Sequence, residues 1–476
     1  MTIDRFEKVI RISRPLADLF IAKDKSLYLV GGAVRDLFLG DDSAYEAEPE
    51  VNELDGPKYD LDFTTDALPD EIEDIVASHS QAMWVQGKRF GTIGVQMGGY
   101  KFEITTHRAE VYHSRSRKPK VTYSDNIVVD LSRRDFTINA MALSLHTAVP
   151  EMVDPYGGLD DLLNKRLVTP LSPEISFSED PLRMLRAARF IAKNSLVPTP
   201  ELVDAVMSMH DRLSIVSVER IRDEFDKLLV TEKPSQGLEF MVKTGLAAEF
   251  IPELPALELE QDPIHRHKDV LAHTIAVVDK SSPDRILRLA ALFHDVGKPK
   301  TKQITPQGVT FYHHDVVGAK MTRERMRALK YSVQDIAEVS DLVFLHLRFH
   351  TYQAGWTDSA VRRYVRDAGP LLERLNELTL CDSTTRNMNK VMVLRERMAD
   401  LKVRIAKLRE KEELGSIRPE INGDEVMKLL NIPPSQLVGE ALDFLMEIRL
   451  EEGMIGKANA TERLLEWWNR RGRLPD

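Results

Sequence analysis

The pattern of apolar residues changes once along the chain, near residue 179. Before that point, short apolar runs that end in glycine turns alternate with short helical stretches; after it, apolar residues recur at the spacing of amphipathic helices almost to the end. We predict one short helix, AVRDLFLG, which Gly40 ends, and longer helices in EDPLRMLRAARFIAK, beginning at Glu179, and VERIRDEFDKLL. The predicted strands are SLYLVGG, YDLDFTT, GTIGVQMGG and YKFEITTH. We therefore expect a small α/β domain followed by a mostly helical body.

Size and composition limit the class of protein. A chain of 476 residues is too long for one ordinary core, so about two to four domains are expected. Cys381 is the only cysteine, which excludes an internal disulfide and a thiolate-rich zinc site and fits a reducing cytoplasm. No uncharged apolar run is long enough to span a membrane, so we expect no membrane partner. The oligomeric state is left open.

The net charge of −10 is not typical of a nucleic-acid-binding protein. Binding needs only a local basic stripe, however, and two segments offer one: Arg115–Lys120, and the helix that carries Arg183, Arg186 and Arg189. Residues 41–58 form an acidic insert that contains proline and glycine and is predicted to be a surface loop.

Two carboxylates flank a leucine in YDLDF. Residues two apart on a strand point to the same face, so Asp60 and Asp62 converge, as a site for Mg²⁺ requires. Glu103 is a third acid inside an apolar strand. Gly31 and Gly32 end the preceding strand, where backbone N–H groups and a helix N-terminus face an anion. A glycine turn beside an acidic pair indicates nucleotidyl transfer.

Six further segments follow or extend this glycine turn and acidic pair, in the order GGAVRD with LDFTT, FGTIGV, FEITTHR, RRDFTINAMAL, DPYGGLDDL and EDPLRMLRAARF. In this order they resemble the motifs of the bacterial and eukaryotic (class II) tRNA CCA-adding enzymes and their poly(A) polymerase relatives. The resemblance covers roughly residues 27–230. It implies a polymerase-β-like nucleotidyltransferase palm that adds CCA without a template to the 3′ end of tRNA, using CTP and ATP and releasing pyrophosphate.

The resemblance also implies roles for single residues. Asp60 and Asp62 would be catalytic and would hold two Mg²⁺ ions, with Glu103 in support. The remaining residues implied to bind nucleotide near this centre are Gly31, Gly32, Arg35, Arg134 and Asp135, the last at the ribose 2′-hydroxyl.

The helix that begins at Glu179 and Asp180 is implied to read the base. Asp180 and Arg183 lie three residues apart and would share a helical face. A carboxylate accepts hydrogen bonds and a guanidinium donates them, so the pair can imitate the edge of a base that complements cytosine or adenine. Arg186 would support them. The basic HSRSRKPK segment matches a loop that the family needs to switch from C to A, which favours full CCA addition.

Eight of the 13 histidines lie between His265 and His350. Their order with aspartates resembles the HD phosphohydrolase superfamily, whose HDVGK signature we place on a helix closed by Gly297. The resemblance implies a metal set that can hold a divalent transition metal or Mg²⁺. The minimal set is His273, His294, Asp295 and Asp382, and His314 and His346 match the histidines that allow a second metal. Such a module can act as a phosphatase or cyclic phosphodiesterase, or remain as an RNA-binding scaffold.

We predict four domains: a palm at 1–169, a helical nucleobase- and RNA-binding domain at 170–256, an HD domain at 257–385 and a helical tRNA-binding tail at 386–476. In the tail, the heptad-like helix VLRERMADLKVRIAKLREKEE is expected to pack on the body, with a short coiled pairing as the alternative. Trp467 and Trp468 are expected to be packing residues rather than a platform for RNA stacking.

Three rival functions stay open. The chain can be a relative that adds only CC, only A, or a poly(A) tail. It can be an HD-type phosphohydrolase whose first domain senses nucleotides. It can also be a noncatalytic RNA-binding scaffold, which the acidic cluster argues against.

Overall fold

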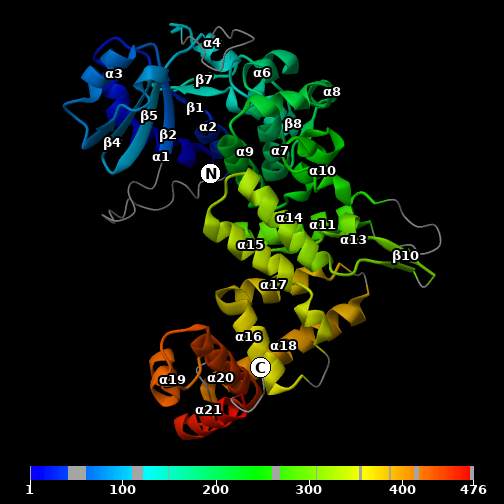
Figure 1. Ribbon diagram of the computed structural model, residues 1–476. Coiled ribbons are helices and arrows are strands. Elements are labelled where there is room, and N and C mark those ends of the chain that lie inside the picture. Colours follow the sequence, from blue (N-terminus) through cyan, green and yellow to red (C-terminus); the bar gives the residue numbers. More distant parts are fainter. Residues whose placement is uncertain are drawn as a thin grey trace. The chain divides into compact units, whose positions relative to one another are not determined.

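The computed structural model describes residues 2–40, 60–109, 122–147, 149–259, 269–306, 308–352, 356–384, 387–411 and 417–471. The chain separates into two compact units, Met1–Phe250 and Ile251–Asp476, whose elements are labelled in Figure 1. The acidic insert at 41–58 and the basic segment Arg115–Lys120 lie outside the described residues. No helix of the described part of the chain is long and apolar enough to cross a bilayer.

The first unit is built on a seven-stranded sheet with the strand order β3-β4-β5-β2-β1-β6-β7. The strands of this sheet are β1 (Tyr28–Val30), β2 (Asp60–Thr65), β3 (Ala82–Trp84), β4 (Thr92–Met97), β5 (Tyr100–Thr106), β6 (Ala142–Ser144) and β7 (Met152–Val153). β2 and β5 are parallel, and the other neighbours are antiparallel. The predicted strands are confirmed as β1, β2, β4 and β5. Strands of two or three residues, such as β6 and β7, are too short to show an alternating pattern.

Helices flank this sheet and continue beyond it, together with a short parallel pair, β8 (Arg166–Leu167) and β9 (Val197–Pro198). The predicted short helix is confirmed as α2, which ends at Gly40 with a positive φ of 78°. The helices of the first unit are α1 (Thr2–Ile21), α2 (Gly32–Leu39), α3 (Pro69–Val76), α4 (Ile127–Ser132), α5 (Gly158–Leu163), α6 (Pro173–Glu179), α7 (Leu182–Asn194), α8 (Pro200–Met209), α9 (Val218–Leu229) and α10 (Ser235–Lys243).

The predicted start of the base-reading helix is wrong by three residues. α6 ends at Glu179 and α7 begins at Leu182, so Asp180 lies in the corner between two helices rather than on a face shared with Arg183. Pro181 explains the break, because a residue before proline avoids the helical region; Asp180 has φ −139° and ψ 100°. Its Oδ1 instead accepts a hydrogen bond from the backbone N–H of Leu182 at 3.1 Å.

In its described residues the second unit is helical, apart from a hairpin of β10 (Gln303–Thr305) and β11 (Gly308–Thr310). Near its C-terminus a separate small core forms around Val426, Leu445 and Leu464. Trp467 and Trp468 pack against it, which confirms their predicted packing role. The helices are α11 (Val270–Lys280), α12 (Arg285–Phe293), α13 (Lys298–Thr301), α14 (His314–Ala328), α15 (Val333–Leu345), α16 (Asp358–Ala368), α17 (Leu372–Asp382), α18 (Met388–Lys411), α19 (Gly423–Leu430), α20 (Gln436–Glu452) and α21 (Lys457–Arg471).

Gly297 does not close a helix, contrary to the prediction. α12 ends at Phe293, residues 294–297 form a turn, and Gly297 precedes α13. Close packing requires glycine at this position, because a Cβ there would lie 2.2 Å from the carbonyl oxygen of His314 and 2.8 Å from the backbone nitrogen of Gly318. The turn therefore lies directly against the first turns of α14.

Candidate functional sites

The parallel pairing of β2 and β5 brings two of the predicted acids together. Asp62 and Glu103 are Cα partners in this register, although 41 positions separate them in the chain. Asp62 is exposed between the buried Leu61 and Phe63, as the alternation of a strand requires. Glu103 is also only partly buried, and its Oε1 lies 3.6 Å from Lys101 Nζ. Asp60 begins β2, two residues before Asp62.

Gly31 brings backbone next to this acidic position. It has φ +73°, a conformation that favours glycine, and it precedes α2. A Cβ at Gly31 would lie 3.3 Å from Arg134 Nη1 and 3.8 Å from Asp62 Oδ2. Gly32 is the first residue of α2. The predicted glycine turn and the predicted acid therefore lie in one place, with Arg134 beside them.

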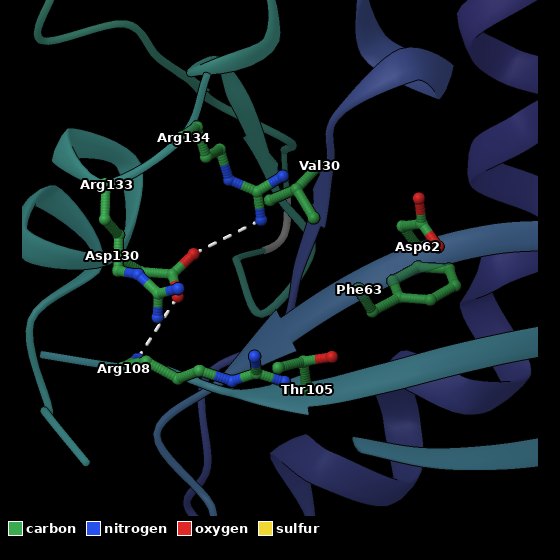
Figure 2. A pocket seen from close by; sticks show the side chains of 8 residues that line it. All are labelled: Val30, Asp62, Phe63, Thr105, Arg108, Asp130, Arg133 and Arg134. Carbon is green, nitrogen blue, oxygen red and sulfur yellow. Dashed lines mark hydrogen bonds and ion pairs between the residues drawn. The ribbon is translucent and has the colours of Figure 1, made fainter. Parts of the chain in front are cut away.

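A pocket of about 280 Å³ opens at this point (Figure 2). Asp130 holds two of its walls together: its Oδ2 pairs with Arg134 Nη2 at 3.2 Å, and its Oδ1 accepts from the backbone N–H of Arg108 at 3.2 Å. Guanidinium groups and carboxylates thus share one cavity, which suits a phosphorylated ligand that carries a cation. The lining residues are Val30, Asp62, Phe63, Thr105, Arg108, Asp130, Arg133 and Arg134.

Three charged residues of this pocket were not among the predicted site residues. Arg108 and Arg133 lie inside motifs that the sequence comparison singled out, FEITTHR and RRDFTINAMAL, so a signal was present. Asp130 lies on the short helix α4, which shows no motif, and only the tertiary structure places it here.

Arg35, which is predicted to lie near the triphosphate, packs behind the glycine turn. Its side chain is buried, at 4% exposure. Its Nη1 donates to Asn139 Oδ1 at 2.5 Å, its Nε donates to Asp36 Oδ1 at 2.7 Å, and its guanidinium lies 5.1 Å from the ring centre of Phe190. These contacts tie α2 to the segment after Arg134 and to α7, so the structure places Arg35 among packing contacts. A role at the triphosphate stays a prediction.

Asp135 and Arg186 form a buried ion pair across 51 residues of chain. Nε and Nη2 of Arg186 donate to Asp135 Oδ2 at 2.8 and 2.5 Å. The other oxygen accepts from the backbone N–H of Phe136 and from Asn139, both at 2.9 Å. Burial opposes the charge of Asp135, but Arg186 and Asn139 outweigh it and lower its pKa. Both carboxylate oxygens of Asp135 therefore already accept hydrogen bonds, and a ribose hydroxyl at the predicted contact would have to share one of them.

The two predicted base-reading residues have other partners in this structure. Asp180 Oδ2 pairs with Arg220 Nη2 at 2.7 Å. Arg183 is buried at 8% exposure; its Nη1 donates to the carbonyl and hydroxyl oxygens of Ser176 and to Glu179, and its Nη2 donates to the carbonyl of Arg133. Arg183 therefore connects α6 to the RRD segment at the pocket.

Glu224 is a further residue that the sequence did not single out. It lies on α9 with 4% exposure and pairs with Arg189, and its other oxygen lies 3.9 Å from Arg186 Nη1. An acid on an amphipathic helix looks like a surface residue in the sequence, so no local pattern could have identified it.

In the second unit, the six predicted metal-binding residues come together from α11, the turn after α12, α14, the end of α15 and α17. Two groups have ligand atoms within 4.8 Å of one another: His273 with His294 and Asp295, and Asp295 with His314 and His346. Asp295 belongs to both. Asp382 joins the first group, with its Oδ1 2.9 Å from His273 Nε2 and 3.5 Å from His294 Nε2. The structure thus brings the predicted set together, although His273 and Asp382 are 109 positions apart in the chain.

The imidazoles are oriented as metal ligands are. Nδ1 of His294, His314 and His346 donates to the carbonyls of residues 291, 311 and 343, at 2.7, 2.8 and 2.6 Å. A carbonyl only accepts, so the proton is on Nδ1 and Nε2 is left to face the cluster. The Nε2 atoms of His314 and His346 are 3.3 Å apart, and those of His273 and His294 are 3.4 Å apart. This donor set of imidazole nitrogen and carboxylate oxygen fits a divalent cation.

Electrostatics within the cluster follow from its burial. Burial alone lowers the pKa of His294, but Asp295 and Asp382 outweigh it and raise the pKa to about 10. Burial and the neighbouring His294 lower the pKa of His346 to about 4. Lys298 Nζ lies 2.6 Å from Asp295 Oδ2. The ammonium of Lys298 therefore balances part of the negative charge of Asp295.

Comparison with known proteins matches three families in succession. Residues 27–168 match the Poly A polymerase head domain, residues 197–257 match the probable RNA and SrmB-binding site of polymerase A, and residues 269–408 match the HD domain. The CCA-adding enzyme of Bacillus stearothermophilus, solved in complex with CTP, has the same fold, with a TM-score of 0.71 and 23% identity over 98% of this chain and 99% of that one. The fold and the two sites define a polymerase-type nucleotidyltransferase head joined to an HD domain.

Relatives with assigned functions narrow this class. The A-adding tRNA nucleotidyltransferase of Deinococcus radiodurans is 32% identical over 78% of this chain and 87% of its own length. The CCA-adding enzyme of Lactobacillus delbrueckii subsp. bulgaricus is 35% identical over 52% of this chain, a match that spans only 58% of that enzyme. The chain belongs to the class II tRNA nucleotidyltransferase family, with an HD domain.

Proposed function

We propose that this chain adds CCA to the 3′ end of tRNA without a template, using CTP and ATP and releasing pyrophosphate. The observation that carries the proposal is the pairing of Asp62 with Glu103 across β2 and β5, beside the backbone of Gly31 and the pocket. Carboxylates next to a glycine turn suit a triphosphate that arrives with Mg²⁺. The function named for the Lactobacillus relative supports addition of CCA, and that named for the Deinococcus relative supports tRNA as the acceptor.

Within this proposal, Asp60 and Asp62 hold Mg²⁺, and Glu103 supports them. Bound Mg²⁺ supplies charge for the departing pyrophosphate and activates the attacking 3′-hydroxyl. The backbone at Gly31 and Gly32 lies against the triphosphate, and Arg134 lies in the pocket wall beside Gly31. Attack is in line on the α-phosphate, and no nucleotide becomes covalently bound to the protein.

We assign base reading to Asp180 and Arg183, with Arg186 in support, and the ribose contact to Asp135. In the structure Asp180 is paired with Arg220, and Arg183 with Ser176 and Glu179. An incoming base must therefore compete for these groups, and a short rearrangement at the corner between α6 and α7 accompanies binding. The division into domains at 1–169, 170–256, 257–385 and 386–476 belongs to this proposal.

The decisive experiment supplies purified protein and Mg²⁺ with a tRNA transcript that lacks its last three nucleotides. CTP, ATP, both, or GTP with UTP are added, and the products are sized and sequenced. We expect three added residues that read CCA only when CTP and ATP are both present. The Asp62→Asn protein should bind the tRNA and add nothing. Two added cytidines, or a long adenosine tail, would contradict the proposal.

One observation favours a narrower activity. The relative that covers 78% of this chain is an A-adding enzyme. The same assay separates the two functions, because an A-adding enzyme extends a transcript that ends in CC and ignores one that ends before it.

A second activity at the HD centre is favoured by the six converging metal ligands. We propose that this centre binds a divalent cation and hydrolyses phosphoesters at RNA 3′ ends. RNA that ends in a 2′,3′-cyclic phosphate or a 3′-phosphate is incubated with Mg²⁺, Mn²⁺, Co²⁺ or Ni²⁺. Asp295→Asn should abolish hydrolysis and spare nucleotide addition, whereas Asp62→Asn should do the opposite. Equal loss in both variants would contradict two separate centres.

A further inference from the structure

One row of paired residues crosses the sheet of the first unit, from the acids to the strand β3 at the edge. Asp62 on β2 pairs with Glu103 on β5. Glu103 in turn pairs with Gly94 on β4, and Gly94 pairs with Trp84 on β3. Residues that are paired directly across neighbouring strands point to the same face of a sheet, so all four share one face. We call this set of four residues the acid–tryptophan row.

The face that carries the acid–tryptophan row is the open face of the sheet. The adjacent row, in which Leu61, Phe102 and Val95 pair, points the other way, and each of these side chains is at most 1% exposed. Trp84 is 38% exposed, and the side chain of Glu103 is 44% exposed. A large aromatic side chain therefore lies at the far end of the surface that begins at the acids.

Gly94 allows the indole of Trp84 to lie across β4, on the side of the acids. A Cβ at Gly94 would lie 3.2 Å from Trp84 Cε3 and 3.8 Å from Trp84 Cδ2, so a side chain at this position would push the ring away. Lys101 Nζ lies 6.0 Å from the centre of the ring and 3.6 Å from Glu103 Oε1. The ring, a cation and an acid therefore form one continuous surface.

The glycine turn and Trp84 lie on opposite sides of the acids. The strand order is β3-β4-β5-β2-β1, and Gly31 directly follows β1. Trp84 is three strands from Asp62 in the other direction, about 14 Å at the usual strand spacing. In the proposed reaction the attacking and leaving oxygens lie in line across the α-phosphate. Because the leaving pyrophosphate lies at Gly31, the RNA that carries the attacking 3′-hydroxyl approaches from the side of Trp84.

We infer that the indole of Trp84 is the stacking platform for the last base of the RNA strand that is being extended. The ring lies across β4, two strands from β2, which is about 10 Å. A nucleotide whose 3′-hydroxyl lies at the acids therefore places its base over this ring, and Lys101 is placed for its phosphate. The inference rests on the proposed function and names a residue that positions the acceptor in it.

Stacking suits an acceptor whose last base changes during the reaction. In CCA addition the last base differs from one step to the next, yet each step must hold it in the same place. Every base has a π-face, so an aromatic ring accepts all of them. The incoming base needs discrimination instead, which we assign to the hydrogen-bonding groups of Asp180 and Arg183. The chemistry of Trp84 therefore favours the acceptor over the incoming nucleotide.

A ring over a glycine also has a structural use, because it covers the gap in the sheet. Two variants separate this use from base stacking. Trp84→Leu keeps an apolar side chain next to Gly94 but removes the aromatic face, whereas Trp84→Phe keeps an aromatic face. Trp84 is partly exposed on an edge strand, so both substitutions leave the buried face of the sheet unchanged.

The test removes the ring from the protein and the base from the RNA, separately and together. A tRNA transcript that lacks CCA is prepared with an ordinary last nucleotide or with an abasic one that keeps its 3′-hydroxyl. The Kd of each is measured by fluorescence anisotropy without nucleotides. We expect loss of the base to weaken binding to the wild type roughly 5- to 150-fold. Trp84→Leu should bind both transcripts equally weakly, and Trp84→Phe should keep the preference for the ordinary one.

Gln96→Leu is the matched control. Gln96 lies on β4 two residues from Gly94, so it is on the same face but outside the acid–tryptophan row. This variant should prefer the ordinary transcript as strongly as the wild type does. A full preference for the ordinary transcript in Trp84→Leu, or an equal loss of that preference in Gln96→Leu, would overturn the inference.

Steady-state kinetics identify which base the ring holds. In the nucleotide-addition assay, Trp84→Leu should raise KM for tRNA and leave KM for CTP and ATP unchanged. A rise confined to CTP and ATP would assign the ring to the incoming base and overturn the inference. The binding measurement needs no nucleotide addition, so it decides the role of Trp84 even where the proposed function fails. Addition of CCA by a wild type that binds both transcripts alike would refute the stacking platform alone.

Discussion

At the scale of single residues, the Asp135–Arg186 pair is the clearest case of a buried charge that depends on one partner. Asp135 is 8% exposed, and both guanidinium nitrogens that reach it come from α7. Without Arg186 the carboxylate would keep only Asn139 and one backbone N–H. Removing one member of such a pair leaves an uncompensated buried charge.

We predict that Arg186→Met lowers the free energy of unfolding by about 3–5 kcal/mol at neutral pH. The double variant Asp135→Asn/Arg186→Met should recover most of that loss, because no unpaired carboxylate remains buried at position 135. Chemical denaturation of the three proteins measures this. Losses that simply add in the double variant would contradict a direct pair.

The pH dependence of the same pair has a definite sign. In the wild type the pKa of Asp135 lies below its ordinary value of 3.8, so its contribution to stability is complete above that value and is lost as the pH falls through the lowered pKa. In Arg186→Met, burial dominates and raises that pKa, so the deficit should shrink as acidification protonates Asp135. Unfolding curves measured between pH 4 and pH 8 test whether the stability deficit of the variant shrinks on acidification.

At the scale of elements, the packing of the HD turn against α14 decides the geometry of the metal ligands. Gly297 lies so close to α14 that a Cβ would meet the backbone of His314 and Gly318. His294 and Asp295 lie on this turn, and His314 is the first residue of α14. A side chain at position 297 would therefore push two groups of ligands apart.

We predict that Gly297→Ala destabilises the protein by about 1–3 kcal/mol through overpacking and weakens Mn²⁺ binding at least roughly tenfold. Gly439→Ala is the matched control, because nothing lies within 4 Å of a Cβ at this position on α20. It should leave Mn²⁺ binding unchanged and stabilise α20 slightly. Calorimetric titration measures both, and equal Mn²⁺ affinity in the two variants would refute the close-packing argument.

At the scale of the whole molecule, the two compact units carry separate chemistry. The acids beside the glycine turn lie in Met1–Phe250, and all six HD ligands lie in Ile251–Asp476. A ligand that binds only the folded form stabilises the unit that holds it. A cation at the HD centre should therefore protect the second unit without requiring the first.

We predict that Mn²⁺ at about 100 times its Kd stabilises the second unit by about 2.7 kcal/mol. Hydrogen exchange with and without EDTA should localise the protection to residues after 251. Asp295→Asn should abolish it, since Asp295 belongs to both ligand groups, and Asp62→Asn should not. Protection that survives in Asp295→Asn would place the cation elsewhere.

The sequence by itself determined the elements with a strong local pattern. The strand that carries Asp62, the helix that Gly40 ends and the amphipathic α9 each repeat their burial period over several residues, and the motif order was enough to indicate the family. Pro181 is a local signal that the prediction of a helix beginning at Glu179 overlooks, since α7 begins only after this proline.

The tertiary structure alone decided which residues meet. The register that pairs Asp62 with Glu103, the bond between Asp135 and Arg186, and the approach of Asp382 to His273 each join segments that are far apart in the chain. The same holds for Asp130 and Glu224, which no motif marked. The physical reason is that periodicity encodes which face of an element is buried, whereas the partner of that face depends on the packing of the whole unit.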